Sequence, residues 1–254
     1  MKNQYFADVG DFGKYGMLSA LQDEGLRLGI NWYLTEDDAR SDGNHVAYMS
    51  HREFRVCDPE RHQFLAACIR SGSRNVAMLA EIPRFQDTKI YASVLGLDHI
   101  PALSEQGRTE RIRHREKWFA ESLTSLAGCD VIFCDPDNGL ETRSGKPYSK
   151  DGVKCTRIEE VKRMLEAGIS VVLYHHRDRS PDVAYAARFA EVRERMGMPE
   201  LALRILRFRR YSVRDYLFFM LPQHRLPMEA AMDSLLRHSG WQRHFEEYRL
   251  AGVR

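Results

Sequence analysis

The segment Asp135-Pro136-Asp137-Asn138-Gly139 places two carboxylates and an amide directly after the apolar run from Val131 to Cys134. The run predicts a buried strand. Asp-Pro followed by Asn-Gly predicts a tight turn at its end, because proline keeps the preceding residue extended and glycine permits positive φ. Open α/β sheets bind ligands at the carboxyl ends of their strands. An acidic pair there indicates chemistry on an amino group, a hydroxyl or a metal ion; the alternative is a plain turn.

A second polar group follows a second predicted strand. Ile169 to Tyr174 is an apolar run of the buried, parallel type, and His175, His176 and Arg177 come next. Neighbouring parallel strands share one crevice, so these residues are candidates to face Asp135. Two adjacent strand residues point to opposite faces, so at most one histidine faces the site unless the strand has ended. Histidine can act as a base, a metal ligand or a phosphate contact. An exposed polar loop is the alternative.

Two basic segments are further candidates for substrate contact. The loop from Arg143 to Gly152 contains Lys146 and Tyr148 and lies between the acidic motif and the next helix; its lysines are equally consistent with a solvated loop. The stretch from Arg204 to Arg214 alternates arginine with apolar residues, as a half-exposed strand does. Phosphate contact and a soluble edge strand both fit that alternation.

Alternating elements indicate an α/β fold. Strands are expected at 30–34, 129–134 and 169–174, with a C-terminal pair at 201–209 and 216–221. Helices are expected at 13–28, 58–69, 107–126, 158–167 and 182–196, while 75–82 fits either a strand or a helix. The tail, 227–248, is expected to be helical with a break at Gly240. The order predicts a mostly parallel central sheet with a C-terminal antiparallel hairpin.

Length and composition set the class of protein. The chain has 254 residues, 43% hydrophobic and 29% charged, with a formal net charge of +2. One domain spanning 1–254 is expected. No apolar run reaches the roughly 20 residues that span a bilayer, and 1–5 is not an apolar signal region, so we expect no membrane partner and a cytoplasmic location. The 5 cysteines have no Cys-x-x-Cys spacing, which predicts reduced and mostly buried thiols.

The order of elements and the strand-end motif resemble class I S-adenosylmethionine-dependent methyltransferases. In the amino-methylating branch, a central strand ends in Asp/Asn-Pro-Pro-Tyr/Phe, and the acidic or amide side chain accepts a hydrogen bond from the target amino group. Asp135-Pro136 matches the first two positions, and the aromatic residue is missing. The resemblance implies a Rossmann-like methyltransferase fold, with Asp135, Asp137 and Asn138 as catalytic candidates.

The N-terminus carries a second, weaker resemblance. Asp11-Phe12-Gly13-Lys14-Tyr15 is similar to the Asp-x-x-Lys-His segment of the large-subunit rRNA adenine methyltransferase family, where it opens a helix near the cofactor. The stretch from Lys2 to Gly16 also resembles the start of an uncharacterised bacterial and phage family with the same Asp-Pro-Asp-Asn-Gly motif. The similarity to the rRNA adenine methyltransferases implies S-adenosylmethionine as cofactor, with Lys14 and Tyr15 among its contacts, whereas the similarity to the uncharacterised family implies no activity.

The usual glycine-rich cofactor loop is absent after the first strand. Thr35-Glu36-Asp37-Asp38 stands in its place, followed by Asp42-Gly43. Asp37 and Asp38 are candidates to bind the ribose hydroxyls or the amino group of the methionine moiety. They could equally bind a metal.

Three functions are open from the sequence. The first is a methyltransferase acting on an amino group of a nucleic acid base or related molecule. The second is a divalent-metal-dependent nuclease or hydrolase using Asp135, Asp137 and Glu141 with His175 or His176, to which Asp37, Asp38 and Asp42 could add oxygen ligands. The third is a methyltransferase-like protein that binds a partner without catalysis. Nucleic acid is the candidate partner, and the oligomeric state is open.

Overall fold

The computed structural model describes residues 1–37, 43–142, 145–178, 180–238 and 240–249. Within these ranges a seven-stranded sheet has the order β2-β1-β3-β6-β8-β7-β9. Its strands are β1 (Leu28–Asn31), β2 (Lys89–Tyr91), β3 (Val131–Cys134), β6 (Ser170–His176), β7 (Ala202–Arg210), β8 (Ser212–Met220) and β9 (Phe245–Tyr248). A separate two-stranded sheet joins β4 (Gly139–Leu140) to β5 (Cys155–Thr156).

One half of the large sheet is parallel. β1 pairs in parallel with β2 and β3, and β3 pairs with β6, so that Ile30 lies beside Phe133 and Phe133 beside Val172. All four residues of β1 and of β3 are buried, as expected for strands covered on both faces. The buried strands predicted from the apolar runs before Asp135 and His175 are therefore confirmed. β2 is a short strand that the sequence pattern did not indicate.

The other half of the sheet is antiparallel. β8 returns beside β6, β7 pairs with β8, and β9 pairs with β7, so the sheet is mixed. The hairpin is longer than predicted, because Arg210 pairs with Ser212 and leaves Tyr211 alone at the tip. The helix predicted for 245–248 is wrong: Phe245 faces the core beside Phe208, and the segment completes the sheet.

β7 is consequently not an edge strand, because β8 and β9 flank it. Its arginines pair with acids on neighbouring strands: Arg204 contacts Glu247 at 2.8 Å, and Arg207 contacts Asp215 at 2.7 Å. The alternating arginines of β7 therefore form cross-strand ion pairs, where the sequence suggested a charged face.

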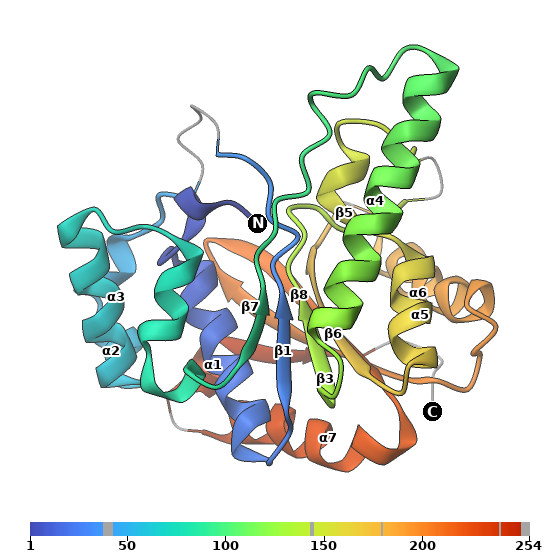
Figure 1. Ribbon diagram of the computed structural model, residues 1–254. Helices are drawn as coiled ribbons and strands as arrows, with labels where there is room; N and C mark the ends of the chain where they lie inside the picture. The colour runs from blue at the N-terminus through green and yellow to red at the C-terminus, as the bar shows by residue number, and fades with distance from the viewer. Residues whose placement is uncertain (38–42, 143–144, 179, 239, 250–254) are drawn as a thin grey trace.

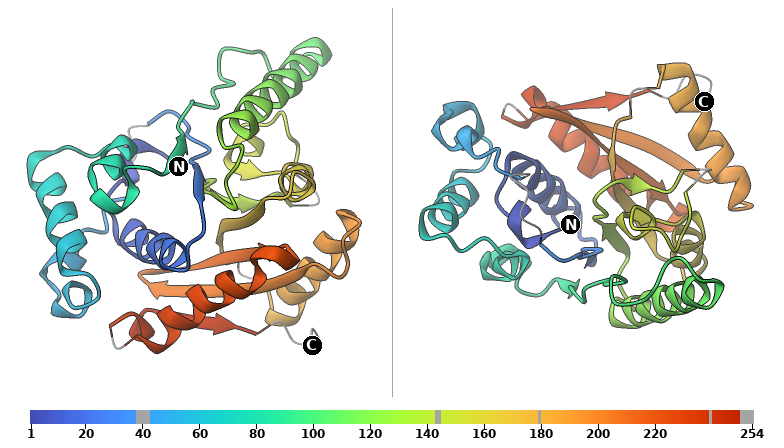
Figure 2. Two further views of the ribbon diagram at one scale, coloured as in Figure 1. Left: turned by 60° about the horizontal axis from the view of Figure 1, so that its bottom comes forward. Right: turned by 90° about the horizontal axis from the view of Figure 1, so that it is seen from above.

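Helices cover both faces of the sheet (Figures 1 and 2). α1 (Val9–Asp23) and α7 (Pro222–Arg237) lie on one face, with α2 (Arg52–Arg55) and α3 (Pro59–Ser71) beyond α1. α4 (Glu105–Ser125), α5 (Ile158–Glu166) and α6 (Asp182–Arg195) lie on the other face. Each face of the sheet has its own hydrophobic core, and successive strand residues point into opposite cores. Phe133 packs on the α1 side, and Ile132 and Cys134 pack on the α4–α6 side. The predicted α/β class is confirmed.

α1 begins four residues before its predicted start at Gly13. The Asp8 carboxylate caps the helix by accepting a hydrogen bond from the Asp11 N–H at 3.1 Å. Gly13 lets the helix approach β7 closely, since a Cβ at this position would lie 2.6 Å from Phe208 Cε2. This approach holds the first turns of α1 over the ends of the strands.

The cysteines and the lengths of the apolar helices bear on the expectations from composition. Cys57, Cys68, Cys129 and Cys134 are free and buried, and Cys155 is free and half-buried. No helix in the described ranges combines the length and apolar character needed to cross a membrane.

Candidate active site

A hollow of about 540 Å³ opens at the carboxyl ends of β3 and β6. The first turns of α1 and the tip of the β7–β8 hairpin form its other walls. The strand order reverses here, because the chain passes from β1 outward to β2 and then back to β3 on the other side of β1. Such a switch point is the usual ligand crevice of an open α/β sheet, and the volume lies in the range of small-molecule sites.

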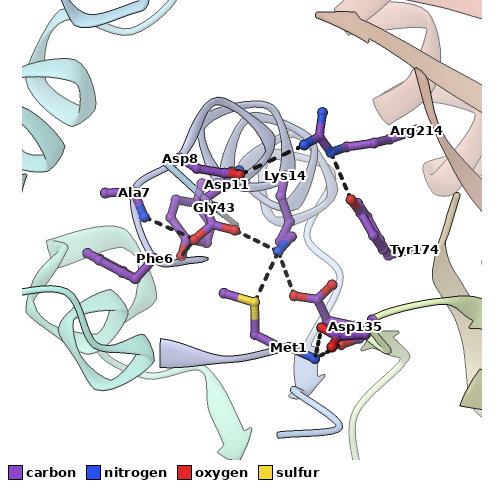
Figure 3. A network of polar contacts seen from close by, with 12 residues as sticks. Met1, Phe6, Ala7, Asp8, Asp11, Lys14, Gly43, Asp135, Tyr174 and Arg214 are labelled. Carbon is purple, nitrogen blue, oxygen red and sulfur yellow. Dashed lines mark hydrogen bonds and ion pairs between the residues drawn. The ribbon is translucent and has the colours of Figure 1, made fainter. Parts of the chain in front are cut away.

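Lys14 lies at the centre of this site, between two carboxylates (Figure 3). Its Nζ is 2.7 Å from Asp11 Oδ1 and 2.5 Å from Asp135 Oδ2. All three residues are at most 3% exposed. Asp11 and Lys14 are three residues apart and so share one face of α1, whereas Asp135 reaches them from the end of β3.

Burial and charge act in opposite directions on these groups. Burial lowers the pKa of Lys14, but the Asp11 and Asp135 carboxylates raise it more, so the net direction is upward. Burial raises the pKa of Asp11 to about 6, although the Lys14 ammonium pulls it down. The Ala7 N–H and the Tyr15 hydroxyl both donate to Asp11 Oδ2. Asp11 is therefore held on both of its oxygens.

Arg214 and Tyr174 form the wall opposite Asp135. Arg214 Nε donates to the Tyr174 hydroxyl at 2.8 Å, and the guanidinium lies 3.8 Å from an Asp8 carboxylate oxygen. Gly10 makes room for this arginine, because a Cβ there would lie 2.8 Å from its Nε. Burial raises the pKa of Tyr174 to about 12, against the lowering effect of the Arg214 charge. The phenol is therefore neutral at neutral pH.

Met1 lies inside the crevice, between the ends of β1 and β3. Its amino group donates to the Tyr33 carbonyl at 3.3 Å and to the Asp135 carbonyl at 2.9 Å, and lies 3.3 Å from Asp137 Oδ1. Its sulfur is 3.9 Å from Lys14 Nζ. These contacts show that three oxygens at this point accept a positively charged amino group.

The backbone after β1 makes a tight turn without glycine. Tyr33 has φ 44, in the left-handed region, and its N–H is held by Asn31 Oδ1 at 3.1 Å. Its hydroxyl donates to Glu160 on α5. A bulky residue at positive φ costs on the order of 1 kcal/mol and persists only where its surroundings impose it.

An aromatic pair stands at the rim of the hollow. His45 lines the hollow, and its ring stacks on Tyr211 at 5.2 Å between centroids. Tyr211 is 55% exposed and has φ 63 at the hairpin tip. An exposed stacked aromatic in a strained conformation is a candidate for ligand contact.

The structure gathers five of the predicted site residues around this hollow. Those lining it are Lys14, Asp135, Asp137, Asn138 and His176. Tyr15 lies beneath them as a hydrogen-bond donor to Asp11.

The other predicted residues lie elsewhere. Asp37 accepts from the Gln4 N–H and borders a separate hollow of about 450 Å³, while Asp38 is outside the described residues. His175 and Lys146 border another hollow of about 380 Å³, on the α6 side of the sheet. His175 Nδ1 accepts from the Leu140 N–H, and burial lowers its pKa to about 3.

Tyr148 and Arg177 contact protein groups. The Tyr148 ring lies under the Arg108 guanidinium, 5.3 Å away. Arg177 stacks on Tyr185 at 4.0 Å and pairs with Asp182 at 3.0 Å. Neither residue lines the hollow that contains Asp135.

Several site residues were missed by sequence reasoning. Asp11 was recognisable from its three-residue spacing to Lys14, and Asp8 from its position as a helix cap. Arg214 lies at the end of the basic stretch from Arg204 to Arg214 noted in the sequence, but nothing local placed it beside Asp135, and His45 carried no local signal. Arg214 reaches the site only because β8 pairs with β6, which sets it beside His176.

The metal-dependent alternative names Asp135, Asp137 and His175 or His176, and Asp135, Asp137 and His176 line the hollow without forming a set of metal ligands. Among the described residues, no group of three or more His, Cys, Asp or Glu side chains is placed to hold a metal ion. The Lys14 ammonium occupies the position between Asp11 and Asp135 where a cation would bind. His175 is turned to the other side of β6, with its Nδ1 on the Leu140 N–H.

Comparison of the chain with protein-family models, curated proteins and solved structures gives no match.

Proposed function

We propose that this protein is an S-adenosylmethionine-dependent methyltransferase that acts on an amino group of a nucleic acid base. The observation that carries the proposal is the position of Asp135. Its carboxylate lies at the end of β3, inside the hollow at the switch point, with Oδ2 fixed by Lys14 at 2.5 Å. Among the described residues, no hydrogen bond reaches Oδ1, which leaves that oxygen to accept one from a target amino group.

The sheet supports the same proposal. The second strand of the C-terminal hairpin lies beside β6 and runs antiparallel to it, and the first strand lies outside. A terminal hairpin after the strand that follows the Asp-Pro strand is what the resemblance to class I methyltransferases implies.

The residues present fit the cofactor's methionine moiety. The oxygens of Tyr33, Asp135 and Asp137 that hold the Met1 amino group are matched to the amino group of that moiety. The positive φ of Tyr33 supplies the backbone turn that glycine usually provides after the first strand. Met1 must move aside for the cofactor to enter.

S-adenosylmethionine, when bound, supplies an activated methyl group. The residues of this chain then act by positioning. Asp135 Oδ1 accepts a hydrogen bond from the target amino group and so orients its lone pair, while Lys14 fixes the carboxylate. Asn138 lines the same hollow beside it. The Tyr211–His45 pair supplies aromatic surface for the base, in place of the aromatic residue missing from the motif.

Calorimetry with S-adenosylmethionine and its demethylated product tests the proposal. We expect binding of both, weakened about tenfold in Asp137→Asn, because that change removes a charged partner worth roughly 1–3 kcal/mol. Asp87→Asn, at an exposed residue outside the hollow, is the matched control. Asp135→Ala should bind cofactor but transfer no methyl group to nucleic acid, and EDTA should leave wild-type activity unchanged. No heat with either compound at millimolar concentration would refute the proposal.

A further inference from the structure

A second hollow, of about 640 Å³, lies between α3 and the segment that contains the 3-10 helix η2 (Ala47–Ser50) and α2. We refer to it as the basic groove. Its polar lining includes His51, Arg52, Arg55, His62, Gln63 and Arg70. None of the described residues that line it carries a carboxylate. The chain as a whole has a net charge of only +2, so this concentration of positive charge is local.

The three arginines of the basic groove form no ion pair with an acidic residue in the described part of the chain. Arg52, Arg55 and Arg70 are exposed, and no ion pair within the described part of the chain includes them. The arginines of β7 differ, since Arg207 is bound by both oxygens of Asp215. The guanidinium groups of the groove are therefore available to an anion from solution.

His62 adds a buried polar atom at the wall of the groove. The residue is 8% exposed, and its Nε2 makes no hydrogen bond of good geometry to the described residues, although the Tyr48 and Met49 backbone lies close enough to the ring to raise its pKa. Buried polar atoms are nearly always satisfied, so this ring has bonding capacity left for a ligand in the groove. Burial lowers the pKa of His62, so the ring is neutral at neutral pH. A neutral ring can bond to a phosphate as a donor without adding to the repulsion among the arginines.

The basic groove and the Asp135 hollow lie at the two ends of one short segment. His45 lines the Asp135 hollow, and Met49 and Ser50, the last two residues of η2, line the groove. Tyr48 of η2 is packed between the two, with its hydroxyl on the Ala7 carbonyl and its ring 6.2 Å from His62. The exposed Tyr211 ring stands on His45 at the boundary.

We propose that the basic groove binds the phosphates of a single-stranded nucleic acid, and that a base of this strand passes Tyr211 into the Asp135 hollow. The inference rests on the proposed function for its target class. A groove lined by arginines and by no carboxylate fits a polyanion. The exposed aromatic pair fits a nucleic acid base, a group that anionic membranes and phosphopeptides do not have. A single strand is required because a base inside a duplex cannot enter the hollow without leaving its stack.

Fluorescence anisotropy with labelled single-stranded RNA and DNA oligonucleotides, without cofactor, tests the inference on the full chain. We expect the triple variant Arg52→Gln/Arg55→Gln/Arg70→Gln to weaken binding at least about tenfold. Each lost phosphate contact to a single strand lowers the slope of log K against log salt by about 0.7, so the slope should fall by about two. Tyr211→Ala should weaken binding about tenfold and leave the slope unchanged, because stacking releases no counterions.

The control removes the same charge from other surfaces. Arg113→Gln/Lys117→Gln/Arg237→Gln changes α4, on the opposite side of the molecule from α3 (Figure 1), and the end of α7. It should bind as wild type does. Equal binding by the groove variant, binding of inorganic phosphate or anionic vesicles but not of oligonucleotides, or no binding at all would overturn the inference. Groove-dependent binding without methyl transfer would support the groove and refute only the methyltransferase proposal.

Discussion

Lys14→Met tests the central contact of the site. Methionine keeps the length of the side chain and its packing near the Trp32 and Tyr174 rings, which lie 5.6 and 5.3 Å from Nζ. It leaves Asp11 and Asp135 facing one another in a site where both are at most 2% exposed. Removing one partner from a buried ion pair costs about 3–5 kcal/mol, because the remaining charge is not compensated. We expect a loss of that size in the free energy of unfolding, a large fraction of the roughly 5–15 kcal/mol typical of a domain.

The loss should depend on pH in a defined direction. The pKa of Asp11 is raised by burial to about 6, above its ordinary value of 3.8, and Lys14 holds it down. Without Lys14 the folded-state pKa rises further. A carboxyl with a raised folded-state pKa stabilises the protein below its unfolded pKa, and this contribution is lost as the pH rises through the folded value. The variant should therefore regain roughly 1 kcal/mol per pH unit relative to wild type between pH 8 and pH 6.

Urea unfolding at pH 8, 7 and 6, followed by tryptophan fluorescence, measures both effects. Asp11→Asn/Lys14→Met should recover at least half of the loss, since it removes one of the two facing carboxylates. Lys162→Met is the matched control: its Nζ lies 3.7 Å from Glu166 on the surface of α5, and it should cost less than about 1 kcal/mol. A loss below about 1 kcal/mol for Lys14→Met, or a loss that grows as the pH falls, would refute the buried arrangement.

Three further predictions concern the strand ends and the hairpin. His175 is buried and its pKa is lowered to about 3, so the free energy of unfolding should fall as the pH drops below about 6.5. His175→Asn keeps an acceptor for the Leu140 N–H and should remove this pH dependence, measured as unfolding during acid titration. Gly139→Ala should lower the free energy of unfolding in urea by at least about 2 kcal/mol, because Gly139 has φ 88 and a Cβ would lie 2.2 Å from His175 Nδ1. An unchanged urea midpoint would contradict this close approach of Gly139 to His175. Tyr211→Asn should raise the melting temperature slightly, since asparagine tolerates positive φ, and should weaken oligonucleotide binding. A lower melting temperature would mean that the stacking of Tyr211 on His45 stabilises the fold.

The local elements of the site could be predicted because they depend on short-range patterns. Val131 to Cys134 is apolar without interruption and is bounded by turn residues, which favours a short strand covered on both faces, and Asp-Pro favours extended backbone where that strand ends. Asp135 at a strand end followed from these residues alone. The same holds for the free, buried cysteines. Asp8 was within reach as a helix cap, but the predicted helix began too late to include it.

The arrangement of the site was decided by tertiary structure. No local pattern sets Lys14 beside Asp135, because the 2.5 Å contact joins residues 121 positions apart and depends on how α1 crosses the sheet. Arg214 reaches the hollow through the pairing of β8 with β6, which sets it beside His176. The 245–248 segment has the composition of a helix, yet it adds a strand because the exposed edge of β7 gains backbone hydrogen bonds from it. Sequence patterns determine which residues are buried and where strands end; long-range packing determines which charges meet there, since the free energy of a buried charge depends on its partners rather than on its neighbours in the chain.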